Sequence, residues 1–142
     1  FRYAEALMIK AECLLRLGQD EEVAAQIVTQ IRERVFEDPL KAKITVEDLK
    51  GDTKIVYGTL DWDNNIETPG DQTPVELGGL YDEWGWEFAC EAQRRTHMIR
   101  FGTYSTKNWF NHVAITDGHT SLFPIPYEER QSNSNLKQNP GY

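Results

Sequence analysis

Apolar residues in the first part of the chain recur every three or four positions, which is the period of an amphipathic α-helix. Residues 3–17 form the first such stretch, and five apolar positions make up one face of it: Tyr3, Leu7, Ala11, Leu14 and Leu15. Gly18 follows directly, at a position where helices commonly end in a left-handed residue. The pattern therefore predicts a helix over residues 3–17.

A second amphipathic stretch follows at once. Asp20 is placed to cap it, with Glu21 and Glu22 in the first turn, where negative charge is favourable. Its apolar positions recur mainly at four-residue spacing: Val23, Ala24, Ile27, Val28, Ile31 and Val35. Asp38–Pro39 is expected to end it, because proline disfavours helix in the residue before it. Two helices with so short a connection pack antiparallel, and their combined length matches one tetratricopeptide unit.

The remaining pattern is less regular. Thr45–Asp48 is typical of a capping box and predicts one short helical turn. From Gly51 to Pro74 neither a helical nor a strand period survives, so we expect a long irregular loop, which is often functional at this length. Further helices are predicted over Leu80–Phe101 and Tyr104–Phe110, and an extended segment over Ser121–Pro126. The fold class is therefore mainly α, with a helix pair, further helices and long irregular loops.

Composition narrows the possible functions. The chain has 142 residues, of which 39% are hydrophobic and 27% charged, as expected for one globular domain. Acidic residues number 23 against 15 basic ones, for a net charge of −8. Binding to nucleic acid or to an anionic lipid surface is disfavoured, because both need a basic footprint. No apolar run in the sequence is long enough to span a bilayer.

The densest charge pattern does not suit catalysis. Glu83, Glu87 and Glu91 fall on one face of the predicted third helix, whereas glycoside hydrolysis needs carboxylates on opposite sides of the substrate. Glu91 lies three and four residues before Arg94 and Arg95, which predicts an ion-pair ladder along the helix. The sequence therefore predicts no catalytic residue, and the protein is expected not to be an enzyme.

Metal and cofactor motifs are also missing from the sequence. Three histidines lack the spacing of a metal site: His97, His112 and His119. Asp61–Glu67 resembles the start of a calcium loop, but Ile66 replaces the required glycine and Gln72 the final glutamate. An EF-hand is excluded, and an adventitious calcium site stays open. No serine elbow or phosphate-binding glycine loop is present, so no cofactor is predicted.

Aromatic residues are the remaining candidates for function. Trp84 and Phe88 lie at helical spacing and are expected in the core. Trp62 lies in the predicted loop among planar polar groups: Asp61, Asp63, Asn64 and Asn65. This combination suits a sugar, whose C–H groups stack on the indole while its hydroxyls bind the polar groups. We predict Tyr57, Trp62 and Asn64 as substrate-binding residues, with the alternative that Trp62 anchors the loop onto the helices.

Several motifs, in this order, resemble the SusD/RagB family of outer-membrane nutrient-binding lipoproteins. The motifs are the Ala-Glu repeats of Arg2–Glu12, then Ile31–Val35, Glu87–Gly102, Leu122–Pro126 and Asn135–Tyr142. The resemblance covers essentially residues 1–142 and is to the C-terminal portion of such a domain, with the upstream portion absent. One stretch departs from the family pattern, because Ala92–His97 keeps only Arg94 of the usual Gly-His-Arg-Trp-Phe-Asp.

The resemblance implies a mostly helical fold of tetratricopeptide-like pairs with irregular loops. It also implies a protein on the cell surface of Gram-negative bacteria, held in the outer membrane by an upstream lipid anchor. Such proteins are not enzymes: they bind oligosaccharides or peptides and deliver them to a SusC-like TonB-dependent transporter. An alternative is that this portion is a structural scaffold that docks the transporter, with the ligand site upstream. The motif residues are expected to fix helix packing: Glu5, Glu12, Glu91 and Arg94.

Overall fold

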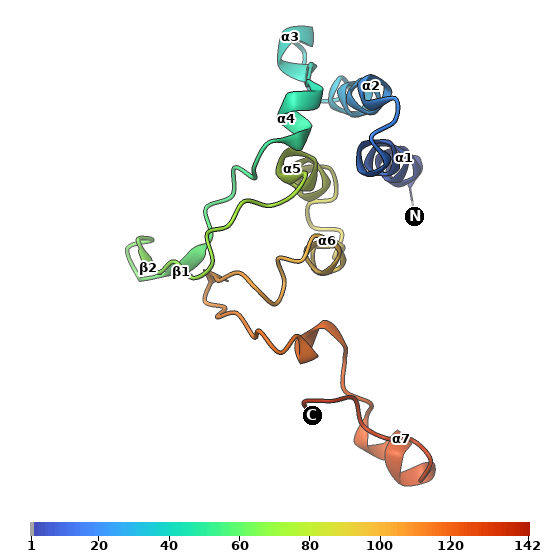
Figure 1. Ribbon diagram of the computed structural model, residues 1–142, viewed down its shortest axis with the longest axis vertical. Helices are drawn as coiled ribbons and strands as arrows, with labels where there is room; N and C mark the ends of the chain where they lie inside the picture. Colours follow the sequence, from blue (N-terminus) through green and yellow to red (C-terminus); the bar gives the residue numbers. More distant parts are fainter. Residues whose placement is uncertain (1) are drawn as a thin grey trace. The chain divides into compact units, whose positions relative to one another are not determined.

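The computed structural model describes residues 2–142, and it is mainly α-helical, as the sequence pattern predicts (Figure 1). Two compact units divide the chain. We call residues up to 56 together with residues 74–97 the helical unit, and residues 57–73 together with residues 98–142 the hairpin unit. The helical unit carries the predicted helix pair, and the hairpin unit carries a small sheet.

The first two helices, α1 (Tyr3–Leu17) and α2 (Glu21–Arg32), form the tetratricopeptide-like pair (Figure 1). The bounds of α1 are those predicted, and Gly18 ends it in a left-handed conformation with a φ of 62°. The buried apolar residues of the pair are mostly small or aliphatic: Ala4, Met8, Ala11, Leu15, Ala24, Ala25, Ile27, Val28 and Ile31. These side chains let the two helices pack closely.

Both ends of α2 differ from the prediction. Asp20 occupies the N-cap position, but its φ is 47° and its carboxylate makes no capping hydrogen bond. The helix ends at Arg32, well before Asp38–Pro39. Asp38–Pro39 instead begins α3 (Pro39–Ala42), because the Asp38 carboxylate accepts a hydrogen bond from the Leu40 N–H at 2.9 Å.

The Arg32 side chain accounts for the early end of α2. Its Nε and Nη2 atoms donate to the carbonyl oxygens of Ala42 and Lys41, each at 2.8 Å. These bonds hold the following segment against the end of the helix. They join residues too far apart for a helical period to reveal them.

The next two helices lie against each other. α4 (Val46–Lys50) begins with the predicted capping box, in which Thr45 Oγ1 accepts from the Asp48 N–H and the Asp48 carboxylate accepts from the Thr45 N–H. α5 (Gly78–Glu87) starts where the chain returns to α4. A Cβ at Gly79 would overlap the carbonyl oxygen of Asp48, so this close approach requires glycine.

The single helix predicted over Leu80–Phe101 is wrong, because two helices occupy this range. α5 ends at Glu87, and α6 (Arg94–Arg100) begins after an irregular reversal. Within the reversal Cys90 and Ala92 have φ values of 64° and 59°, a left-handed conformation that no α-helix contains.

Aromatic side chains from α5 and its C-terminal end form the core of the helical unit. Trp84 and Phe88 are buried as predicted, with ring centroids 5.2 Å apart. Tyr81 is buried beneath the Arg94 guanidinium, which lies 3.7 Å from the ring centroid. Arg94 also donates to the Tyr81 carbonyl at 2.9 Å, so it fixes the reversal that follows α5.

The hairpin unit is built on three short strands: β1 (Gly58–Leu60), β2 (Ile66–Thr68) and β3 (Trp109–Phe110). β1 pairs antiparallel with β2, where Thr59 lies opposite Thr68, and parallel with β3, in the order β2-β1-β3. The loop expected over Gly51–Pro74 therefore contains a hairpin. The helix predicted over Tyr104–Phe110 is wrong, since its last two residues are a strand.

Beyond the sheet the chain is irregular apart from η1 (His119–Ser121) and α7 (Tyr127–Ser132). Leu122 has φ and ψ of −103° and 156°, which agrees with the extended segment predicted there. The Gln138 side chain holds this segment by exchanging hydrogen bonds with the backbone N–H and carbonyl of Ile125, at 2.8 and 3.0 Å.

Candidate functional site

The turn between β1 and β2 presents a tryptophan to solvent. Trp62 has a fractional exposure of 103%, and every residue from 61 to 70 is exposed. Carboxylates and amides flank the indole on both sides along the chain: Asp61, Asp63, Asn64 and Asn65. An exposed indole of this kind is unusual, because tryptophan is normally highly buried.

Asp61 organises this turn. Its Oδ1 atom accepts hydrogen bonds from the N–H groups of Asp63 and Asn65 at 2.9 and 2.8 Å. These backbone bonds, that of Asn65 first, and the Asn65 side-chain amide lower the pKa of Asp61. Asn64 takes a φ of 62°, which asparagine tolerates better than most residues. The indole therefore projects from an ordered turn.

The base of the hairpin is fixed by a buried lysine. Lys107 is only 4% exposed, and its ammonium donates to the carbonyls of Thr73 and Asp71 at 2.5 and 3.1 Å. The Asp71 carboxylate lies 3.6 Å away and balances the charge. Next to it, the Asn108 amide donates to the Thr68 carbonyl at 3.3 Å. Residues after β2 are thus tied to the segment that leads into β3.

The three predicted binding residues do not share one surface. Trp62 and Asn64 lie two residues apart in the exposed turn. Tyr57 is 5% exposed, and the Lys107 ammonium lies 5.4 Å from its ring centroid. Because its ring is enclosed at the base of the hairpin, Tyr57 supports the hairpin and does not offer a ring face to a ligand.

The ladder predicted from Glu91 to Arg94 and Arg95 is not formed. Two carboxylates of α5 and Glu91, which follows this helix, pair instead with arginines near the ends of the first two helices, at 2.5 to 2.8 Å: Glu83 with Arg32, Glu87 with Arg2 and Arg34, and Glu91 with Arg2. The motif residue Glu12 accepts from Trp84 Nε1 at 2.9 Å. For Glu12, Glu91 and Arg94, the expected role in helix packing is confirmed.

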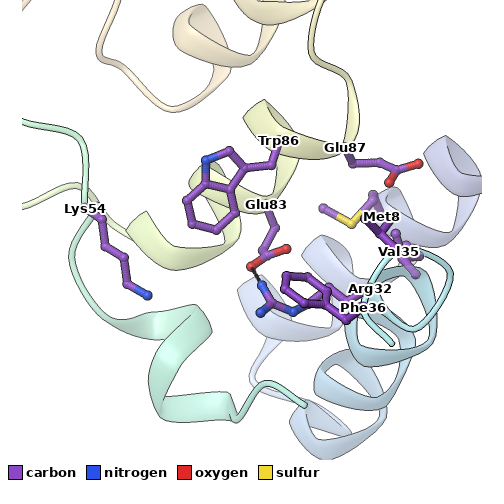
Figure 2. A pocket seen from close by; sticks show the side chains of 9 residues that line it. Met8, Arg32, Val35, Phe36, Lys54, Glu83, Trp86 and Glu87 are labelled. Carbon is purple, nitrogen blue, oxygen red and sulfur yellow. Dashed lines mark hydrogen bonds and ion pairs between the residues drawn. The ribbon is translucent and has the colours of Figure 1, made fainter. Parts of the chain in front are cut away.

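A pocket of about 410 Å³ lies beside these ion pairs in the helical unit (Figure 2). Its lining comes from α1, α2 with the residues that follow it, the loop after α4, and α5: Met8, Ile31, Arg32, Val35, Phe36, Lys54, Glu83, Trp86 and Glu87. Burial raises the pKa of Glu83, while the nearby Arg32 guanidinium opposes the shift. In the view of Figure 2, the Trp86 indole lies above the Glu83 carboxylate, with Lys54 to one side.

The sequence pattern does not predict this pocket. Trp86 is 53% exposed, although it lies in the same helix as the buried Trp84. Its helical spacing indicates that it faces away from Trp84, but nothing in the pattern indicates that Lys54 and Phe36 lie nearby. The pocket walls come from distant segments, so only the folded chain brings them together.

Two features are absent from residues 2–142. No group of three or more His, Cys, Asp or Glu side chains in this range is arranged to hold a metal ion. No helix within it combines the length and the apolar character required to cross a bilayer.

These features define a mainly α-helical protein whose charged motif residues hold helices together and whose exposed indole projects from an ordered turn. The chain belongs to the SusD family, whose sequence profile matches residues 1–118. It is 27% identical over 150 residues to the starch-binding protein SusD of Bacteroides thetaiotaomicron, covering all of this chain and 21% of that protein. It is 31% identical over 140 residues to a SusD-like protein of Formosa agariphila, covering 94% of this chain and 22% of that protein. The chain thus spans about a fifth of the length of these relatives.

Proposed function

We propose that this chain is part of a protein that captures oligosaccharides and does not transform them. Family membership supports binding as the activity, and the relative from Bacteroides thetaiotaomicron carries starch binding in its name. The carboxylates of α5 support the same reading, because their arginine partners hold them in helix contacts.

The observation that carries the proposal is the exposed indole of Trp62. Its side chain is fully accessible, and Asp61 orders the turn that presents it. Asn64 lies in the same turn, so its amide can bind sugar hydroxyls while the indole stacks against C–H groups. A turn that is already ordered loses little conformational freedom when it binds, which favours affinity.

The wider setting is proposed from the family. Residues 1–142 would form the C-terminal portion of a longer cell-surface protein, anchored in the outer membrane by a lipid upstream. Its partner would be a SusC-like TonB-dependent transporter that receives the captured oligosaccharide. The chain's net charge of −8 is compatible with a neutral glycan, which needs no charge to attract it.

The test is binding of an oligosaccharide panel (α-glucan, β-glucan, mannan and xylan fragments) to the full-length protein by calorimetry. We expect Trp62→Ala to weaken binding by about 1–3 kcal/mol, the range of an interface aromatic anchor. Asn64→Gly should weaken it less, because glycine keeps the left-handed turn and removes only the amide. Ile66→Ala, a neighbouring exposed apolar substitution, serves as the control.

Two alternatives have distinct outcomes in the same experiment. If Trp62→Ala leaves glycan affinity unchanged, the ligand site lies outside this turn, and this chain acts as a scaffold that docks the transporter. If the protein binds none of the glycans but binds short peptides included in the panel, it is a peptide-binding member of the family.

A further inference from the structure

The pocket in the helical unit is balanced in charge. Two cations and two anions line it: Arg32, Lys54, Glu83 and Glu87. Arg32 and Glu83 contact each other at 2.5 Å, and Glu87 is held by Arg34 at 2.6 Å and by Arg2 at 2.8 Å. The formal charges of the lining cancel, so an uncharged ligand that both donates and accepts hydrogen bonds fits this composition.

Three polar groups in the pocket remain available to a ligand. In the part of the chain that the structure describes, Lys54 Nζ has no hydrogen-bond or ion-pair partner, and neither does the indole N–H of Trp86. Glu83 uses only Oε1 for Arg32, which leaves Oε2 as an acceptor. Two donors and one acceptor therefore surround a pocket whose other charged groups, Arg32 and Glu87, are held in ion pairs.

The rest of the lining supplies an apolar surface. Trp86 offers part of its indole, being 53% exposed, and Phe36 adds a second, half-exposed aromatic ring, while the buried Met8 and Ile31 lie beneath them. A volume of about 410 Å³ lies in the lower part of the ~300–1,000 Å³ range of small-molecule sites. Such a pocket accommodates one or two sugar rings and not a long chain of them.

We propose that this pocket is a second carbohydrate-binding site, independent of Trp62, which holds a neutral mono- or disaccharide unit against Trp86. One ring face stacks on the indole, Lys54 donates to one hydroxyl, and Glu83 Oε2 accepts from another. The proposal takes its ligand class from the proposed function, but it rests on separate residues in the helical unit. A protein with both sites would bind carbohydrate at two separate places.

Fluorine resonances from fluorotryptophan provide a site-specific test. The full-length protein is labelled with fluorotryptophan, and the Trp62, Trp84 and Trp86 resonances are assigned through Trp→Phe variants. Maltose, cellobiose, mannobiose and xylobiose are then titrated into the protein at millimolar concentration. At least one of them is expected to shift the Trp86 resonance saturably, and Trp62→Ala should leave this shift unchanged.

Substitution of the lysine tests the polar contact. Lys54→Met keeps the length of the side chain but removes the ammonium, and should weaken the Trp86 response about fivefold. Lys10→Met, at an exposed lysine outside the pocket, should have no effect. An unmoved resonance of the buried Trp84 reports that each variant keeps its fold.

The outcomes separate the two sites. A Trp86 resonance that none of the four disaccharides moves would overturn this inference, and so would a response that survives Lys54→Met at full affinity. A Trp62 resonance that fails to respond, beside a Trp86 resonance that does respond, would instead count against the hairpin proposal alone.

Discussion

The hydrogen bond from Trp84 to Glu12 is expected to be a main energetic link between α5 and α1. Trp84 Nε1 donates to Glu12 Oε2 at 2.9 Å, and the two residues are 2% and 4% exposed. A hydrogen bond to a charged group contributes about 1.5–3 kcal/mol, and leaving a buried partner unsatisfied costs a similar amount. Glu12→Ala should therefore destabilise the protein by about 2–4 kcal/mol, since it leaves the indole N–H buried without this acceptor.

A double-mutant cycle isolates the interaction. Trp84→Phe removes the N–H while keeping an aromatic ring, and Glu12 still accepts from Arg16 Nε at 2.9 Å. We expect a coupling energy of about 1.5–3 kcal/mol between Glu12→Ala and Trp84→Phe. Urea unfolding followed by far-ultraviolet circular dichroism measures it, because this signal does not depend on the substituted tryptophan.

The matched control is Arg16→Ala. Arg16 is partly exposed and pairs with Glu12 from one turn away, so its loss should cost no more than about 0.5 kcal/mol. A coupling energy below about 0.5 kcal/mol in the Glu12 and Trp84 cycle would refute the argument that this bond links the two helices.

Three further predictions concern other contacts. Gly79→Ala should cost about 1–3 kcal/mol in a thermal unfolding experiment, since its Cβ would overlap the Asp48 carbonyl and force α4 to move; an unchanged melting temperature would contradict this. Lys107→Met removes the donor to the carbonyls of Asp71 and Thr73, so amide hydrogen exchange over residues 57–73 should become faster while α1 stays protected. Unchanged exchange over residues 57–73 in the variant would contradict a local role for Lys107. The pKa of Glu83 is raised in the folded state, so the folded state holds this proton more tightly than the unfolded one, and stability falls as pH rises from the ordinary value of 4.5 toward the folded pKa. Unfolding free energies measured across this range should decline less steeply in Glu83→Gln than in the unsubstituted protein. The same pH dependence in both proteins would contradict a raised pKa at Glu83.

Local signals in the sequence predicted the elements that local interactions determine. The α1 helix has the predicted bounds, because its apolar period and Gly18 both act within a few residues. The capping box at Thr45 is a contact between residues three apart, and it is present. The exposed turn at Trp62 and Asn64 is also local, since its polar residues are adjacent in the chain, whereas the role of these two residues in binding stays a prediction.

Features that depend on distant residues were not predicted. The spacing of Glu91 and Arg94 predicts an ion pair between them, but Arg94 binds the Tyr81 carbonyl and Glu91 binds Arg2. The early end of α2 likewise depends on carbonyls that Arg32 reaches only in the folded chain. The pocket beside Trp86 combines side chains from segments that no sequence window contains.

The arginine contacts also explain why a dense charge pattern and an accessible pocket occur side by side. Arg2 and Arg34 both bind Glu87, the last residue of α5, so the Glu87 carboxylate is held between two cations. Arg32 does the same for Glu83 and also ties down the segment after α2. Because these charges stabilise the contact between α5 and the first two helices, the groups left for the proposed ligand are Trp86 and Lys54, outside the network, and the Oε2 atom of Glu83. The residues that fix the helices therefore also determine which polar groups of the pocket stay unpaired.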